Sequence, residues 1–376
     1  MNIGFDAKRA FLNGSGLGNY SRNTIELMSH YFPEHQYNLF TPDDDPTMFN
    51  KELLRHPSIH MKTPDNFVDR LFSYNWRTNR IKKELINEGI QLYHGLTNEL
   101  PVGINKTGIK SIVTIHDLIF LRYPHLYHSI DRFIYNKKIK RALEIADMII
   151  SVSEQTKTDI INFYNIKPEK IRVIYQGCNS VYYEETPEES KSVIRMKFDL
   201  PSQFLLSVGT VEERKNVLSL IKAIHEYQID CPLVVVGAIR KKYFDSIRKY
   251  LSDHRIRDVY FLENVELHDL HVIYQMASVF VYVSVFEGFG IPIVEALNSK
   301  VPVITSIGGC FSEAGGPGSI YIDPKNIEEL ADSIKKVLHD SSLKQRMVDE
   351  GYKHAYNFRQ DKIAHNLNHI YCEIIN

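Results

Sequence analysis

The chain lacks most of the features that mark specialised protein classes. Its 376 residues include only four cysteines, which form neither a CxxC pair nor a metal-binding spacing, so reduced thiols are expected. No run approaches eighteen apolar residues, and the N-terminus lacks a charged-then-apolar signal pattern. We therefore expect a cytoplasmic protein without a membrane-spanning helix. The cysteines are Cys178, Cys231, Cys310 and Cys372.

Neither sign of charge dominates the sequence. Lys and Arg number 45 and Asp and Glu 46, which gives a net charge of −1 with the two signs interspersed. A general nucleic-acid binder is usually clearly basic, so no nucleic-acid partner is expected. A basic aromatic stretch, residues 132–141, leaves two interpretations open: contact with an anionic membrane at its inner face, or a solvated helix face.

Short apolar runs rich in β-branched residues alternate with longer amphipathic segments. This alternation predicts α/β units with parallel sheets covered by helices on both faces. Because 376 residues exceed one ordinary core, two such units are expected. The predicted strands are Asn2–Asp6, Ile112–Ile115, Met148–Val152, Arg172–Tyr175, Phe204–Val208, Leu233–Val236, Val259–Leu262, Val279–Val283 and Val301–Ile304.

A charged segment without an apolar run, residues 184–197, predicts the boundary between the two units. The first unit then spans residues 1–183 and the second residues 184–352, each with a doubly wound sheet. Ligands of such sheets bind beyond the carboxyl ends of the strands. Apolar residues at helical spacing predict a final helix over His354–Ile375, within residues 353–376.

Residues 284–297 carry the strongest functional signal. Gly288 and Gly290 open a loop after an apolar strand, and Pro292 stands where a first helical turn would begin. The free N–H groups of that turn form a natural anion site. Glu287 and Glu295 bracket the loop with carboxylates that accept hydrogen bonds from hydroxyls. Such an arrangement predicts a nucleotide-sugar ligand.

Three other segments each allow a functional and a structural interpretation. The glycines Gly16 and Gly18 precede a helix expected from about Ser21, and serve either a phosphate or sugar contact or a turn. Their spacing does not fit the dinucleotide-binding fingerprint. His116-Asp117 follows a buried strand, where sites of α/β proteins gather. Such a histidine is equally compatible with a purely structural role.

The third segment follows the predicted strand that ends at Val208-Gly209. A short loop delivers Arg214 and Lys215 before a helix predicted over Val217–His225. Two cations at the carboxyl edge of a sheet suit a diphosphate, whereas the alternative is a solvated charge cluster.

Together these segments resemble the retaining glycosyltransferases of family 4, which have the GT-B fold of two Rossmann-like domains. The resemblance covers nearly the whole chain in the expected order, and its most specific part is the stretch from Glu287 to Glu295. The other matching segments are Gly16-x-Gly18, His116-Asp117, residues 151–157, residues 173–177 and residues 208–216. The pattern is closest to the bacterial mannosyltransferase-like branch.

The resemblance implies a role for each matching residue. Glu295 would bind the donor ribose, Glu287 would lie near the donor sugar, and Lys215 with Arg214 would neutralise the diphosphate. His116 would contact the transferred sugar. The remaining donor-binding positions would be Gly16, Gly18, Gly209, Gly288, Phe289 and Gly290.

The family also implies the partners and cofactors. A GDP-linked sugar such as GDP-mannose would be a co-substrate rather than a cofactor, no metal ion would be needed, and the acceptor would be a glycan or a lipid-linked saccharide. The first unit would serve the acceptor and the second the donor, while residues 353–376 would return to the first unit.

Departures from the family pattern and rival functions remain open at this point. Thr210 stands where many relatives carry an Arg, so the second cation for the diphosphate would be Arg214. Ser15 replaces a common glycine. Ser299-Lys300 stands where a glycine is usual, and we infer no functional consequence there. The rivals are a glycoside hydrolase with Glu287 and Glu295 as its acid/base pair, a nucleotide-sugar epimerase or phosphorolytic enzyme on the same fold, and a non-catalytic nucleotide-binding protein.

Overall fold

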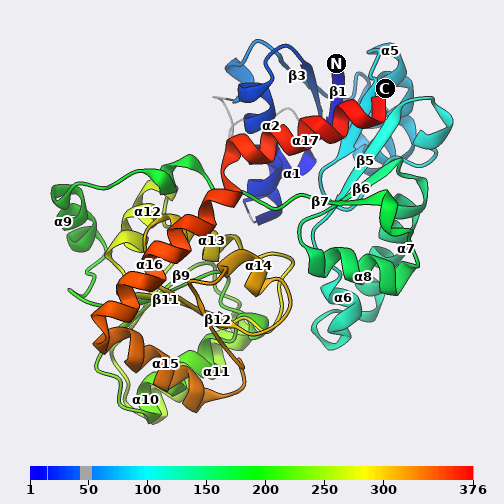
Figure 1. Ribbon diagram of the computed structural model, residues 1–376. Coiled ribbons are helices and arrows are strands. Elements are labelled where there is room, and N and C mark those ends of the chain that lie inside the picture. The colour runs from blue at the N-terminus through cyan, green and yellow to red at the C-terminus, as the bar shows by residue number, and fades with distance from the viewer. Residues whose placement is uncertain (15, 43–52, 376) are drawn as a thin grey trace. The chain divides into compact units, whose positions relative to one another are not determined.

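The computed structural model describes residues 1–14, 16–42 and 53–375, which form two compact units (Figure 1). Unit 1 comprises Met1–Gln176 together with the segment that begins at Gln360, and unit 2 comprises Gly177–Arg359. The division between Gln176 and Gly177 lies a few residues before the one predicted at 183/184. Ser15, one of the departures from the family pattern, lies outside the described residues.

Unit 1 contains a seven-stranded parallel sheet in the order β3-β2-β1-β4-β5-β6-β7. Its strands are β1 (Asn2–Asp6), β2 (Gln36–Phe40), β3 (Ile59–Lys62), β4 (Leu92–Gly95), β5 (Lys110–Ile115), β6 (Met148–Ser151) and β7 (Ile171–Val173). Its helices are α1 (Lys8–Leu12), α2 (Gly16–Tyr31), α3 (Phe67–Leu71), α4 (Ser73–Asn75), α5 (Lys82–Asn87), α6 (Ile119–Arg122), α7 (Ser129–Ile145), α8 (Glu154–Tyr164) and α17 (Gln360–Ile375). Short helical turns are η1 (Leu53–Arg55), η2 (Trp76–Arg80), η3 (Ile104–Lys106), η4 (Pro124–Leu126) and η5 (Pro168–Lys170).

Unit 2 contains a six-stranded parallel sheet in the order β10-β9-β8-β11-β12-β13. Its strands are β8 (Leu205–Val208), β9 (Leu233–Val236), β10 (Val259–Leu262), β11 (Val279–Tyr282), β12 (Val303–Ser306) and β13 (Ile320–Ile322). Its helices are α9 (Glu188–Lys197), α10 (Val217–Glu226), α11 (Lys241–Asp253), α12 (Leu267–Met276), α13 (Ile291–Asn298), α14 (Phe311–Gly315), α15 (Ile327–His339) and α16 (Ser341–Ala355). Short turns are η6 (Ser180–Tyr183), η7 (Glu213–Lys215) and η8 (Tyr356–Phe358).

The sheets are buried on both faces, as their continuous apolar strands predict. In β5 the adjacent residues Ile112 and Val113 belong to separate apolar clusters on opposite faces of the sheet, because successive strand side chains point to opposite sides. The two parallel sheets confirm the predicted doubly wound architecture. In the described part of the chain, no helix is long and apolar enough to cross a membrane.

Several predicted elements need correction. Strands β2, β3, β4 and β13 were not predicted, because each is short or interrupted by polar residues. Asn38 on β2 and His94 on β4 are buried, and each bonds a partner distant in sequence: Asn38 Nδ2 donates to Asn2 Oδ1 at 2.7 Å, and His94 Nδ1 lies 2.7 Å from the Tyr371 hydroxyl. No local sequence pattern reveals such partners.

The predicted helix over His354–Ile375 is wrong in its extent. Helix α16 ends at Ala355, a short turn follows, and the extended backbone of Arg359 separates that turn from α17. Figure 1 shows α17 beside α2, and its Ile363, Leu367 and Ile370 join the unit 1 core. The apolar positions used in the prediction thus belong to α17.

The helix expected from about Ser21 begins earlier, at Gly16, so the predicted glycine loop is the first turn of α2. A Cβ atom at Gly18 would lie 1.8 Å from the Asn13 carbonyl oxygen and 3.0 Å from that of Arg9. Glycine at position 18 is therefore required by the close packing of α2 on the end of α1. A Cβ at Gly16 would meet nothing within 4 Å.

Gly18→Ala is expected to lower the free energy of unfolding by about 1–3 kcal/mol, because backbone must move to relieve the overlap. Gly16→Ala is the matched control and should change it by less than about 1 kcal/mol. Urea unfolding of both variants measures the difference, and equal effects would contradict the packing role of Gly18.

Candidate active site

The candidate site in unit 2 lies at the carboxyl ends of the neighbouring strands β8 and β11. The segment after β8 carries Arg214 and Lys215 on the short turn η7, and Asn216 then adopts a left-handed conformation with φ 59° before α10. The segment after β11 carries Glu287 and leads into α13. Adjacent parallel strands therefore deliver two cations and a carboxylate to one sheet edge, as expected for α/β sites.

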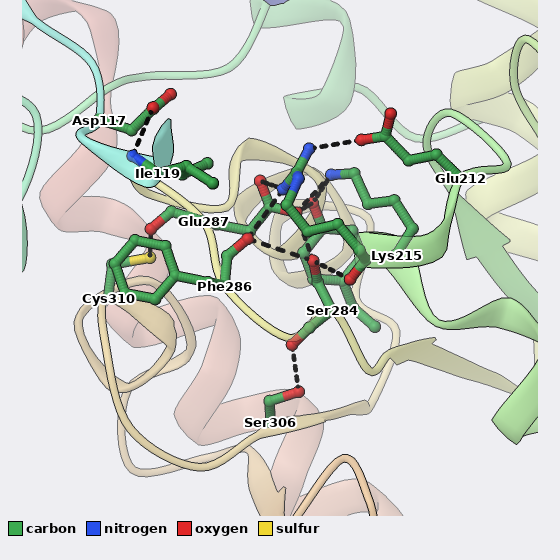
Figure 2. A network of polar contacts seen from close by, with 11 residues as sticks. Asp117, Ile119, Glu212, Lys215, Ser284, Phe286, Glu287, Ser306 and Cys310 are labelled. Atoms are coloured by element: carbon green, nitrogen blue, oxygen red, sulfur yellow. Dashed lines mark hydrogen bonds and ion pairs between the residues drawn. The ribbon is translucent and has the colours of Figure 1, made fainter. Parts of the chain in front are cut away.

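Glu287 joins these two segments. Its Oε1 lies 2.5 Å from Lys215 Nζ and its Oε2 lies 2.6 Å from Arg214 Nη1. The Ser284 hydroxyl donates to the same Oε1 at 2.6 Å (Figure 2). The Tyr282 hydroxyl accepts from Lys215 Nζ at 2.5 Å and lies 3.1 Å from Glu287 Oε1. Both carboxylate oxygens are thus engaged by cations.

The charges control the protonation of this cluster. Burial favours the neutral form of Glu287, yet Lys215 and Arg214 overcome it and lower the pKa of the carboxyl to about 2. Burial also lowers the pKa of Lys215, an effect that the Glu287 charge opposes. The Glu287 side chain, only 12% exposed, is therefore a carboxylate at neutral pH.

Arg214 is held by protein groups on several sides. Besides Glu287, its guanidinium donates to the Phe286 carbonyl and to Glu212 Oε1, each at 2.8 Å. Its own carbonyl accepts from the Val285 N–H at 2.8 Å. These contacts fix the loop before α13, so the geometry favours a positioning role for Arg214.

The start of α13 has the geometry that the sequence predicted. Gly290 takes φ 111°, which an L side chain rarely adopts, and Pro292 occupies the first turn. The Phe289 side chain is buried and packs edge-on against Phe358 at 5.4 Å between ring centroids. The Phe289 side chain is therefore part of the packing and is not available to a ligand.

Glu295 lies one turn further along α13 in a different environment. The Tyr274 hydroxyl donates to its Oε2 at 2.9 Å. Burial raises the pKa of Glu295 to about 7, and the hydrogen bond from Tyr274 opposes that rise. The carboxyl is consequently a mixture of acid and carboxylate at neutral pH, in contrast to Glu287.

His116 in unit 1 is buried and held at both ring nitrogens. Its Nε2 lies 2.9 Å from the Leu96 carbonyl, to which it donates, so that Nδ1 accepts from Gln176 Nε2 at 3.1 Å. Tyr20 packs edge-on against the ring at 4.5 Å between ring centroids. Burial lowers the pKa of His116 to about 4, so the ring is neutral at physiological pH. These contacts suit an oriented neutral side chain.

The remaining predicted residues are placed as follows. Gly209 has φ 142°, and a Cβ there would lie 3.4 Å from the Lys215 side chain, so glycine leaves room for that cation. Gly288 lies in the loop that carries Glu287. Residues 1–14, 16–42 and 53–375 contain no group of three or more His, Cys, Asp or Glu arranged to hold a metal ion.

Sequence reasoning missed several residues that complete these clusters. Tyr282 is the last residue of the apolar strand β11, and Tyr274 and Gln176 reach their partners from distant positions. Ser284 is the first residue of the 284–297 segment, and its position directly after a predicted strand could have identified it as a site residue.

Known protein families match both halves of the chain. The model described as "Glycosyltransferase Family 4" matches residues 15–180, and the model described as "Glycosyl transferases group 1" matches residues 191–354. The two matched regions together include His116, Arg214, Lys215, Glu287 and Glu295.

Two curated relatives are similar over most of the chain. The O-antigen chain mannosyltransferase B of Escherichia coli is 30% identical over 275 residues, which cover 71% of this chain and 70% of the relative. The O-antigen chain mannosyltransferase RfbU of Salmonella typhimurium is 30% identical over 235 residues. That alignment covers 60% of this chain and 62% of the relative, less than two thirds of it.

Solved structures share the fold. A glycosyltransferase from Rickettsia africae aligns with a TM-score of 0.78 at 19% identity, covering 100% of this chain and 98% of that one. HepE of Anabaena in complex with UDP and glucose aligns with a TM-score of 0.75 at 18% identity, covering 99% and 100%. These likenesses and the two parallel sheets establish the GT-B fold.

As pH rises, Glu295 and Glu287 should change the free energy of unfolding in opposite directions. The pKa of Glu295 is raised in the folded state, so folding favours its protonated form. As pH rises from about 4.5 through 7, Glu295 therefore lowers the free energy of unfolding by a growing amount. Glu295→Gln should therefore gain stability relative to the wild type across this window, on the order of 2 kcal/mol. Denaturant unfolding at pH 5 and pH 8 measures the change, and a pH-independent difference would contradict it.

Glu287→Gln is the matched variant with the opposite expectation. The depressed pKa of Glu287 stabilises the fold above about pH 4.5, and this contribution is lost as pH falls through about 2. The substitution also leaves Lys215 and Arg214 without their carboxylate. We expect a loss of about 3 kcal/mol at pH 7 that shrinks at acidic pH, measured in the same unfolding series.

Proposed function

The chain belongs to the family 4 glycosyltransferases, and on this premise we propose that it transfers mannose from a GDP-linked donor to a glycan or lipid-linked saccharide. We propose further that the transfer retains the anomeric configuration and needs neither a metal ion nor a cofactor. The choice of mannose is supported by the two relatives named as mannosyltransferases. The observation that carries the reaction class is the Lys215–Glu287–Arg214 cluster beside the start of α13.

The chemistry requires the bond between the sugar and the diphosphate to break. Negative charge develops on the leaving diphosphate and positive charge on the sugar ring, so fixed cations and backbone N–H groups near the leaving group lower the barrier. Lys215 and the N–H groups at the start of α13 would supply these interactions in unit 2. Arg214 would act by holding Glu287 and the loop, since its guanidinium bonds protein groups.

The two glutamates would serve different parts of the donor. Glu295, whose Oε2 accepts from Tyr274, would accept hydrogen bonds from the ribose hydroxyls. Because its pKa is about 7, donor affinity should rise as pH increases from 6 to 8 and more of the carboxylate forms. Glu287 would hold Lys215 in place beside the donor sugar. The roles of His116, Gly16 and Gly18 remain predictions.

A panel of nucleotide-sugars tests the proposal directly. Thermal unfolding with GDP-mannose, UDP-glucose and other donors should show the largest stabilisation with GDP-mannose, since a ligand that binds only the native state stabilises it. NMR of the product then reports the anomeric configuration, and assays with a chelator report the metal requirement. Donor isomerised without acceptor would indicate an epimerase, sugar phosphate formed with added phosphate a phosphorolytic enzyme, and hydrolysis of a simple glycoside a hydrolase.

Lys215→Ala should lower kcat by about 10²- to 10³-fold at saturating donor, because a fixed cation at the leaving group is lost. Stability should fall much less, since Arg214 still pairs with Glu287. Lys249→Ala on the exposed side of α11 serves as the control for loss of a lysine. If the fall in kcat only followed the fraction of the variant that is unfolded under assay conditions, Lys215 would have a purely structural role.

A further inference from the structure

The outward side of α7 is apolar over its first half and basic over its second. Ile130, Phe133 and Ile134 are 72%, 68% and 41% exposed. They recur at the three- and four-residue spacing that places side chains on one helix face. One and two turns further along the same face lie the exposed lysines Lys137 and Lys140. The opposite side, with Ile139, Ala142 and Leu143, packs into the unit 1 core.

A second group of exposed apolar residues lies on α3 and α4. Phe67, Leu71 and Phe72 are 78%, 66% and 60% exposed, although large aromatic side chains are normally buried. The two groups adjoin where the Lys138 ammonium of α7 lies 4.8 Å from the ring centroid of Tyr74 on α4. We call the exposed sides of α3, α4 and α7 the apolar-basic face.

Helix α7 is richer in basic residues than the chain as a whole. Helix α7 carries five basic residues against two acidic ones, whereas the whole chain has a net charge of −1. Among the described residues, its exposed apolar side chains Ile130, Phe133 and Ile134 belong to neither core cluster of unit 1. Apolar side chains beside lysines match a lipid interface, where rings enter the acyl boundary and ammonium groups meet phosphates.

We propose that the apolar-basic face docks on the surface of an anionic lipid bilayer. We favour a lipid partner over a protein because the exposed apolar side chains can enter the acyl boundary while the neighbouring lysines reach anionic headgroups. The proposal rests on the proposed function in one respect: a lipid-linked saccharide acceptor is presented at such a surface. It gives the open question of membrane contact a defined location.

The face is also connected to the carboxyl edge of the unit 1 sheet. Lys138 Nζ bonds Glu99 Oε1 at 3.0 Å, and Glu99 in turn pairs with Arg77. Arg77 Nη1 lies 2.5 Å from Asp6 Oδ2, at the end of β1. This chain of charges, buried at Arg77 and Asp6, runs from the face to the edge where parallel sheets bind ligands, so an acceptor anchored in lipid would start close to that edge.

The test uses the full chain and vesicles of phosphatidylcholine with or without an equal part of phosphatidylglycerol. Co-sedimentation should show binding to the anionic vesicles that weakens with added salt, and little binding to pure phosphatidylcholine. The double variants Phe133→Ser/Ile134→Ser and Lys137→Gln/Lys140→Gln should each lower the partition coefficient about tenfold or more. Phe67→Ser/Phe72→Ser, at the two ends of α3, provides a third variant, should a change in α7 impair folding.

The matched control is Val193→Ser/Met196→Ser on α9 of unit 2, where the two side chains are 57% and 77% exposed. This variant should bind vesicles like the wild type. The proposal is overturned if the wild type ignores anionic vesicles, if it binds neutral vesicles equally, or if control and face variants behave alike. Unchanged donor binding in the face variants would separate a failure here from a failure of the proposed transferase activity.

Discussion

The carboxylate of Glu287 holds together two segments that are far apart in the sequence. By pairing with Lys215 and Arg214 it ties the turn after β8 to the loop that begins α13. Glu212, which also pairs with Arg214, brings the cluster to two carboxylates and two cations, so each of these charges has a partner within the protein. The low pKa of Glu287 keeps this arrangement charged throughout the physiological range.

This constraint assigns different tasks to residues of the same type. Glu287, in the loop before α13, is fixed as a carboxylate between cations, whereas burial raises the pKa of Glu295, on α13, to about 7. Lys215 and Arg214 are adjacent in sequence, yet the Arg214 guanidinium is engaged by protein groups: it bonds Glu212, Glu287 and the Phe286 carbonyl. Neither glutamate resembles a partner in a two-carboxylate hydrolytic pair, because Glu287 is already neutralised by protein cations.

The sequence predicted the features that depend on local pattern. The buried strands of unit 2 and the proline at the start of α13 follow from apolar runs and from the fixed φ of proline. The glycines at 16 and 18 were misread as a loop, because a helix that begins with glycine contradicts propensity and is set by packing against Asn13. The contacts of Glu287 with Lys215, and of His94 with Tyr371, bridge distant segments and follow only from the fold.

The position of α17 affects the order in which the protein is completed during synthesis. Unit 1 is formed by residues up to Gln176 and by the segment from Gln360, so unit 2 is translated in between. The Tyr371 hydroxyl that bonds the buried His94 reaches its partner only after unit 2 has emerged from the ribosome. Until then the face of unit 1 that receives Ile363, Leu367 and Ile370 stays uncovered. The first unit to be synthesised is therefore the last to close, and a chain interrupted before α17 would expose that face to aggregation.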